Sequence, residues 1–388
     1  MKDTIEKTSP LAGRKVALTD NISATKFKTT CGSKMLIDYQ PVFNAAVVEK
    51  LENAGLIITG KLNIDEFGLS ETKEFSAFCS ALDAQQSAAG EIPLIAAVDS
   101  GGNIRQSALR GATGIKPTYG SVSRYGIIAC ASSLDQAGPV GRDIEDCAAL
   151  LSVISGPDDR DSTCIIKKSF EFDKPAQDNS LKNIKIGLPR NILDGSLTDM
   201  NPEIKTAFLS AVKEFETAGA SVEKFEMPLV EYIIPVFNII EAAEISSNLA
   251  KFDGLKFGYR SPNAKTLSDV YKLSRSEGFG MEVKTKIMLG SLVLSSGCYD
   301  LYYRKALQTR TLIIEAYKKL FEQYDMILSP ISAGDPITLS VNLAGLPAAA
   351  LPCGKGIGFQ LIGEAFAESK LINAARFYQK KTGEHNNV

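Results

Sequence analysis

One segment organises this sequence: Ala97-Val98-Asp99-Ser100-Gly101-Gly102-Asn103-Ile104-Arg105-Gln106. An apolar run from Ile92 to Val98, interrupted only by Pro93, precedes it and breaks at Asp99. The two glycines that follow allow the backbone to turn sharply with its N–H groups on one side. Such a turn can hold an anion, although a plain strand-ending turn explains the glycine pair at least as simply.

A second phrase follows directly, Gly111-Ala112-Thr113-Gly114-Ile115-Lys116-Pro117-Thr118-Tyr119-Gly120. Together the two phrases resemble the centre of the amidase signature family and, within it, the A subunit of glutamyl-tRNA(Gln) and aspartyl-tRNA(Asn) amidotransferases, which typically have D-T-G-G-S-I-R-Q here. The resemblance extends from about Leu11 to Phe377. It implies an α/β/α sandwich with a mixed, mostly parallel, twisted central sheet.

The expected domain organisation is simple. A chain of 388 residues with 44% hydrophobic content can bury a large core. We expect an N-terminal extension at 1–10, a single amidase-like domain at 11–378 and a polar tail at 379–388. Within the domain, the polar and charged segment 156–183 predicts a surface linker.

Apolar periodicity and turn residues predict several elements. These are a short strand within 11–22, a helix at 45–53, a buried strand at 56–61, a helix at 144–154, a strand at 184–189, a helix at about 203–218 and a strand after 219. The first three form a β-α-β unit, which favours parallel pairing. The glycines at 354–358 match neither the G-x-x-x-x-G-K-[ST] spacing of a P-loop nor the glycine spacing of a dinucleotide-binding loop. They predict a hairpin instead.

Composition excludes several kinds of chemistry. The 43 basic and 45 acidic residues give no sign of direct nucleic-acid contact. No apolar run is long enough for a membrane span, so we expect a cytoplasmic protein. His385 is the only histidine, which argues against Ser-His-Asp and two-histidine metal chemistry. We expect no metal, no cofactor and seven reduced cysteines.

The resemblance implies a catalytic triad that this chain has lost. The acylated serine of G-G-S-I-R corresponds to Asn103, and the lysine of I-K-D-N-I corresponds to Thr19. The second serine belongs to a G-G-S-S-G-G loop, which is missing because the chain passes from S-A-F at 76–78 to A-A-G-E at 88–91. We expect Asn103 to hydrogen-bond within its own turn. Ser100 is a possible substitute nucleophile, but no base for it is evident.

Other positions carry remnants of substrate binding, again by resemblance. Gly101 and Gly102 form the turn, and Asp335 corresponds to the acid that binds the glutamine α-ammonium group. The arginine of E-V-K-R-R-I that grips the glutamine carboxylate corresponds to Lys286 or Thr285, so a bidentate grip is lost.

Three cations are considered in this region of the predicted site. Lys15 and Lys116 are expected to be solvated. Arg105 and Lys116 could also form an anion-binding patch at the mouth of the former active site, with solvation or structural ion pairing as the alternative.

Three functions remain open. The first is a catalytically inactive pseudoenzyme, retained as a binding or scaffold protein or decaying. The second is the family's reaction, in which glutamine is hydrolysed and the ammonia serves tRNA-dependent amidation in protein biosynthesis. The third is amino-acid binding through Asp335. The resemblance implies B-type and C-type subunits as partners, and Tyr299, Tyr302 and Tyr303 either anchor such a partner or line the core.

Overall fold

A computed structural model of the chain describes residues 9–69, 76–77, 94–165, 172, 181–193, 201–332 and 335–383. Its strands form a ten-stranded sheet in the order β2-β1-β3-β5-β4-β9-β10-β8-β6-β7. The strands are β1 (Lys15–Thr19), β2 (Ile57–Leu62), β3 (Leu94–Asp99), β4 (Thr113–Lys116), β5 (Gln136–Gly141), β6 (Lys185–Pro189), β7 (Ser221–Phe225), β8 (Met326–Ile331), β9 (Ala348–Gly354) and β10 (Ile357–Gly363).

Parallel pairing is confined to the two ends of this sheet. β1 pairs in parallel with β2 and β3 at one end, and β6 does so with β7 and β8 at the other. The pairings between them, from β3 across to β8, are antiparallel. The mixed α/β sheet is therefore confirmed. The expectation that it is mostly parallel is wrong, because hairpin-type pairing such as β9 with β10 builds its centre.

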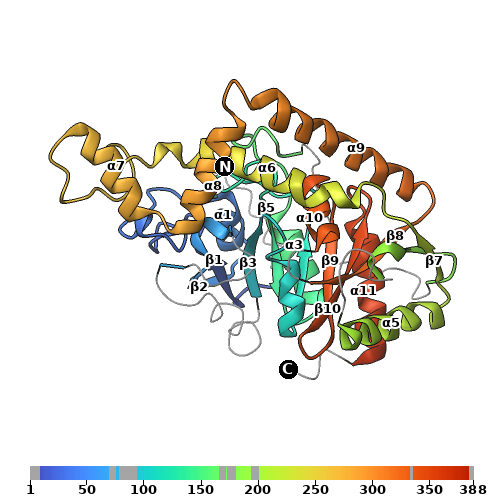
Figure 1. Ribbon diagram of the computed structural model, residues 1–388. Coiled ribbons are helices and arrows are strands. Elements are labelled where there is room, and N and C mark those ends of the chain that lie inside the picture. The colour runs from blue at the N-terminus through green and yellow to red at the C-terminus, as the bar shows by residue number, and fades with distance from the viewer. Residues whose placement is uncertain are drawn as a thin grey trace.

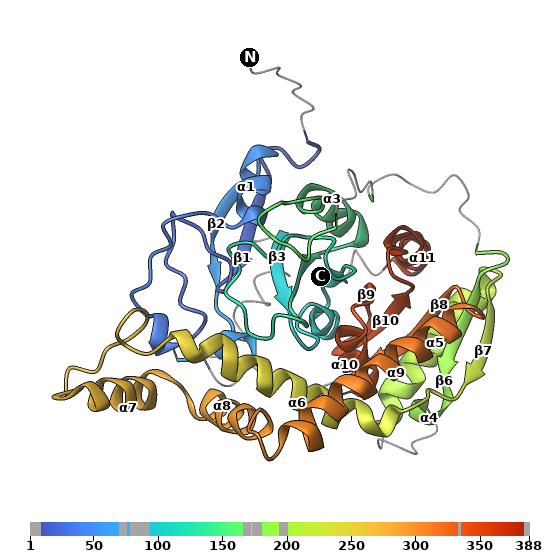
Figure 2. The same ribbon diagram turned by 90° about the horizontal axis from the view of Figure 1, so that it is seen from above.

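Helices cover both faces of the sheet (Figures 1 and 2). They are α1 (Ala46–Asn53), α3 (Ile144–Ile154), α4 (Arg190–Leu193), α5 (Pro202–Thr217), α6 (Val230–Asn248), α7 (Leu267–Gly278), α8 (Met281–Val293), α9 (Arg304–Phe321), α10 (Pro336–Leu343) and α11 (Glu368–Thr382). Short turns of helix are η1 (Lys34–Leu36), η2 (Glu66–Gly68), η3 (Arg105–Arg110), η4 (Leu249–Lys251) and the π-helix η5 (Tyr299–Tyr303). None of the helices in the described part of the chain is long and apolar enough to cross a membrane.

Two hydrophobic clusters occupy the two faces. Helices α1, α3, α5 and α11 supply the first cluster, and α6, α9 and α10 supply much of the second. Successive side chains of a strand point to opposite faces. On β8, Met326 and Leu328 accordingly lie in the first cluster, whereas Ile327 lies in the second. This alternation makes the sheet the middle layer of a sandwich.

The predicted elements agree with the structure except at one strand. The helix at 144–154 has the predicted bounds, since Asp143 caps it by accepting a hydrogen bond from the backbone N–H of Asp146 at 2.8 Å. The β-α-β unit of β1, α1 and β2 is parallel, as expected. The prediction that β2 is buried is wrong, because it is an edge strand on which Ile57 is 53% exposed.

The remaining sequence features lie near the C-terminus and in the linker. The glycines at 354–358 form the predicted hairpin between β9 and β10. Helix α11 continues to Thr382, past the expected start of the tail at 379. Half of the segment 156–183 lies outside the described residues, as does Cys79. No disulfide is recorded among the described cysteines.

Phe215 tests how α5 is held to the sheet. Its ring stacks on Tyr378 of α11 with centroids 5.6 Å apart and meets Phe359 of β10 edge-on at 6.0 Å. Because its side chain is fully buried, Phe215→Ala should lower the free energy of unfolding by about 3–5 kcal/mol. Urea unfolding followed by far-UV circular dichroism measures this change.

The matched control is Leu209→Ala on the same helix, where the side chain is 40% exposed. That substitution should change stability by only about 0.5 kcal/mol. Equal effects of the two substitutions would contradict the packing described.

Candidate functional site

Strand β3 ends at Asp99, whose carboxylate holds the turn that follows. It accepts hydrogen bonds from the backbone N–H groups of Gly102 (2.9 Å) and Ile104 (3.0 Å). The side chains of Arg105 (3.2 Å) and Asn342 (2.8 Å) donate to the same carboxylate. Through Asp99, the turn is thus held against both η3 and α10.

Burial by itself would raise the pKa of Asp99. The nearby Arg105 and Lys116 cations and the hydrogen bonds from Asn342 and Arg105 outweigh that effect, so the pKa lies below its ordinary value. Arg105 also donates to the carbonyl of Thr338 at 2.5 Å, and its side chain is fully buried. Of the roles considered for Arg105, structural ion pairing is therefore confirmed.

Lys116 is not solvated, and that expectation is wrong. Its side chain is fully buried and donates to Gln136 Oε1 at 2.6 Å and to the carbonyl of Leu346. Burial lowers its pKa well below the ordinary value for lysine. Because these acceptors enclose the ammonium group, Lys116 cannot form the surface anion patch considered above. Lys15 is exposed, as expected.

Gly101 and Gly102 allow two helices to approach the turn. A Cβ atom at Gly102, where φ is +129°, would lie 2.8 Å from Thr338 Cγ2 of α10. One at Gly101 would lie 3.0 Å from Phe237 Cζ of α6. This close packing explains both glycines. A role of either glycine in substrate binding stays a prediction.

Ser100 has an unexpected partner. Its hydroxyl donates to Asp135 Oδ1 at 2.7 Å, and the same carboxylate accepts the backbone N–H groups of Cys130 (2.9 Å) and Ala131 (3.2 Å). Burial raises the pKa of Asp135 to about 7, against the lowering effect of these three donors. Ser100 and Asp135 are each 2% exposed, so the pair joins the turn to the loop before β5.

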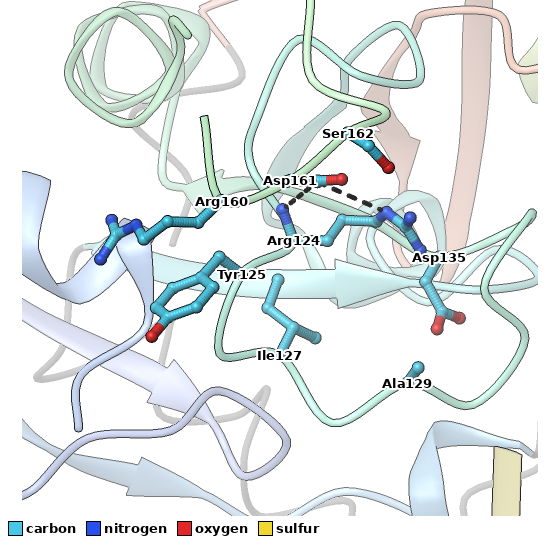
Figure 3. A pocket seen from close by; sticks show the side chains of 8 residues that line it. All are labelled: Arg124, Tyr125, Ile127, Ala129, Asp135, Arg160, Asp161 and Ser162. Atoms are coloured by element: carbon cyan, nitrogen blue, oxygen red, sulfur yellow. Dashed lines mark hydrogen bonds and ion pairs between the residues drawn. The ribbon is translucent and has the colours of Figure 1, made fainter. Parts of the chain in front are cut away.

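Asp135 also borders a small cavity of about 200 Å³ (Figure 3). The two arginines of this cavity are already paired. The guanidinium of Arg124 forms an ion pair with Asp161 at 3.8 Å, and Arg160 pairs with Glu49 at 2.7 Å and Asp158 at 2.8 Å. The described lining of this cavity therefore offers no uncompensated cation to an anionic ligand.

Asn103 and Asn21, the bonding partner of Thr19, approach the same backbone position, Gly68. Asn103 Nδ2 donates to the carbonyl of Gly68 at 3.2 Å, and Thr19 Oγ1 donates to Asn21 Oδ1 at 2.8 Å. A Cβ atom at Gly68 would lie 3.8 Å from the amide nitrogens of both Asn103 and Asn21. The expectation that Asn103 bonds within its own turn is thus wrong, because Asp99 already holds that turn.

No lysine is bonded to Asn103 or to Ser100 within the described ranges. Lys61 of β2, the strand that pairs with β1, donates to Thr29 Oγ1 at 3.1 Å and to the carbonyl of Ile22. Residues 78–93, where the serine-bearing loop is missing from the sequence, lie outside the described residues.

Lys286 is neutralised by α6. Its ammonium group forms an ion pair with the buried Glu241 and donates to Asn238 Oδ1 at 2.9 Å. Thr285, the other candidate at this position, donates to the carbonyl of Met281 in its own helix at 2.9 Å. A carboxylate ligand at Lys286 would have to compete with Glu241 for the same charge.

Asp335 is the N-cap of α10. Its carboxylate accepts hydrogen bonds from the backbone N–H of Ile337 (3.2 Å) and from the backbone N–H (3.4 Å) and hydroxyl (3.2 Å) of Thr338. Burial raises its pKa to about 6. A helix cap explains Asp335 without any ligand, and binding of an ammonium group there stays a prediction.

The partners of these residues could not be read from the sequence. Asp135 and Asn342 sit in the phrases S-S-L-D-Q and V-N-L-A-G-L-P, but nothing in their spacing indicates that both reach the turn at Ser100. Glu241 lies on α6, 45 residues before Lys286. Only the packing of α6 and α10 against the sheet brings these groups together.

Comparison with known proteins places this geometry in context. The family model described as amidase matches residues 2–85 and 83–340. The A subunit of glutamyl-tRNA(Gln) amidotransferase from Lachnospira eligens is 45% identical, covering 97% of this chain and 85% of its own length. The corresponding protein of Geobacillus thermodenitrificans is 41% identical over 98% of this chain and 85% of its own.

Solved structures agree with the sequence comparison. The crystal structure of the A subunit of glutamyl-tRNA(Gln) amidotransferase from Thermotoga maritima superposes with a TM-score of 0.79 at 33% identity, covering 97% of this chain and 84% of that one. The native peptide amidase of Stenotrophomonas maltophilia gives a TM-score of 0.78 at 25% identity, with 97% and 84% coverage.

The pKa of Asp135 predicts how stability depends on pH. Because the folded-state pKa of about 7 lies above the ordinary 3.8, this carboxyl group stabilises the fold fully below about pH 4, and that contribution is lost as pH rises through 7. Asp335, with a pKa of about 6, acts in the same direction. Urea unfolding between pH 4 and 8 should show a decline of roughly a few kcal/mol.

Two variants separate the contribution of Asp135. Asp135→Asn should flatten the decline in stability with pH, because asparagine does not titrate in this range. It should also lower stability at every pH, because the asparagine amide presents a donor where a backbone N–H needs an acceptor. Ser100→Ala keeps the carboxyl group but removes a donor to its ionised form, so the decline should extend to higher pH. An unchanged profile in Asp135→Asn would show that other groups cause it.

Proposed function

Because the chain belongs to the amidase family and is related within it to the A subunit of glutamyl-tRNA(Gln) amidotransferase, we propose that it is a non-catalytic member with a binding or scaffold role. The observation that carries this proposal is Asn103. A neutral carboxamide occupies the nucleophile position and is bound to the carbonyl of Gly68, which is not a base.

The other positions of the triad support the same conclusion. Thr19 stands where the family has its lysine, and its hydroxyl donates to Asn21. A threonine hydroxyl cannot accept a proton near neutral pH. Nucleophile, relay and base act as a unit, so the loss of one costs nearly as much rate as the loss of all.

Ser100 is the remaining candidate nucleophile, and its bond to Asp135 has the form of a nucleophile and base. Two features argue against this role. Both groups are almost completely buried, and the carboxylate also accepts two backbone N–H groups. These contacts are those of a structural tie between a turn and a loop.

An exposed apolar surface supports a binding role. On α8, Met281 and Met288 are 74% and 73% exposed, and Leu292 is 55% exposed. The adjoining π-helix contributes Leu301 and Tyr302, and none of its residues is buried. The alternative that the tyrosines at 299–303 line the core is therefore wrong. We assign this face to a B-type or C-type subunit in the cytoplasm.

A glutaminase assay tests the catalytic part of the proposal. Ammonia release from glutamine by the purified protein should not exceed that of buffer. Neither Asn103→Ser nor Asn103→Ser with Thr19→Lys should restore it, since the relay serine is still missing. Turnover that disappears in Ser100→Ala would overturn the proposal and make Ser100 the nucleophile.

Co-purification tests the scaffold part. When the chain is expressed with B-type and C-type subunits, at least one of them should be retained, and Met288→Asp with Leu292→Asp should abolish retention. Leu209→Asp, at an exposed leucine of α5, is the control and should not. Failure to retain either of them, where a catalytically active relative retains both, would contradict the scaffold role.

Amino-acid binding remains the alternative for the same site. If it holds, glutamine or asparagine should raise the melting temperature and Asp335→Asn should remove the effect. A non-catalytic scaffold predicts no such shift.

A further inference from the structure

A second cavity lies away from the residues discussed above. It is about 670 Å³ in volume and lies between η1, with the residues that follow it, and the connection from α6 to α7. These two segments are joined where the backbone N–H of Tyr259 donates to the carbonyl of Met35 at 2.7 Å, and Figure 2 shows them at the end of the molecule that carries α7. A volume of this size suits a small-molecule ligand.

Local contacts hold the connection in shape. The carboxylate of Asp253 accepts the backbone N–H groups of Leu255 (2.8 Å) and Lys256 (3.0 Å). Arg275 of α7 donates to the carbonyl of Phe252 at 2.8 Å. Gly258, at a φ of +87°, lets the chain pass so close to η1 that a Cβ atom would lie 2.5 Å from a methionine sulfur. The wall of the cavity is thus preformed.

Three cations line this cavity without an acidic partner in the described chain. Lys251, Lys256 and Arg260 form no side-chain hydrogen bond or ion pair with any part of the chain that the structure describes. The acidic side chain among the described lining residues, Asp38, is already paired with Lys28 at 3.0 Å. The cavity therefore carries an excess positive charge that the described part of the fold does not neutralise.

The cationic rim adjoins an apolar wall. Phe252 is buried at 5% exposure, whereas the ring of Phe257 is 56% exposed and available to a ligand. Leu36 and Ile128 continue the apolar lining. An exposed aromatic ring beside clustered cations is the arrangement that holds a planar group and a phosphate together.

We propose that this cavity binds a phosphorylated small molecule with a planar body, of the class of a nucleoside monophosphate. The charge of the rim decides for phosphate over carboxylate. Three uncompensated cations match a phosphate monoester, which carries a charge of about −2 at neutral pH, better than a single carboxylate. The planar body would lie against Phe257. The cavity shares no residue with the site around Asn103, so its function is independent of the proposal made for that site.

Isothermal titration with adenosine 5′-monophosphate and with 1-naphthyl phosphate tests this assignment. At least one of them should bind with a dissociation constant below about 1 mM, whereas adenosine and inorganic phosphate should each bind at least about tenfold more weakly. Lys256→Gln with Arg260→Gln should reduce the affinity at least about tenfold, since each charge-assisted contact contributes on that scale. Phe257→Ser should weaken binding of the organic phosphates but not of inorganic phosphate.

The control is Lys272→Gln, a cation of α7 outside the cavity, which should leave affinity unchanged. Because the substituted side chains are exposed, unaltered melting temperatures should accompany the affinity changes. Absence of binding by both organic phosphates would overturn the proposal. The proposal would also be overturned if Lys256→Gln with Arg260→Gln did not weaken binding. It would be overturned as well if adenosine or inorganic phosphate bound as tightly as the organic phosphates, because the proposal requires that both the ring and the phosphate are recognised.

Discussion

The turn after β3 keeps its shape because a buried carboxylate is bound from several directions at once. Asp99 accepts two backbone N–H groups of its own turn, the guanidinium of Arg105 and the amide of Asn342. Removing one partner of such a buried pair leaves an uncompensated charge in a low-dielectric interior, which is strongly destabilising. The turn therefore stays rigid whether or not it carries a nucleophile, and the chain can lose catalysis while it keeps the local fold.

The sequence predicted those elements well whose apolar spacing, caps or turn residues lie within the element itself. The bounds of α3 follow from its apolar spacing and its cap at Asp143, and the hairpin between β9 and β10 follows from its glycines. The direction of pairing was not local information. Whether a strand pairs in parallel depends on which strand becomes its neighbour, and β4 and β9 become neighbours although more than 200 residues separate them.

In the candidate site, too, some residues could be identified from the sequence and their partners could not. The resemblance singled out Thr19 and Asn103, and the structure shows that Asn103 bonds to Gly68 whereas Thr19 bonds to Asn21. The sequence did not predict the burial of Lys116, because the acceptors that surround its ammonium group lie 20 and 230 residues away. It also missed the bond from Ser100 to Asp135, since a carboxylate 35 residues further along the chain carries no spacing signal.

The strand order has a consequence for synthesis of the chain. β1, β2 and β3 form one parallel unit and β6, β7 and β8 another, and the hairpin of β9 and β10 is inserted between β4 and β8 to join them. That hairpin spans 348–363, so it leaves the ribosome after all the remaining strands of the described sheet, β1 to β8. Until it does, β4 is paired only with β5 and β8 only with β6, so each strand has one open edge that invites pairing with other chains. A nascent chain of this topology therefore depends on protection of two open edges until its last strands are made.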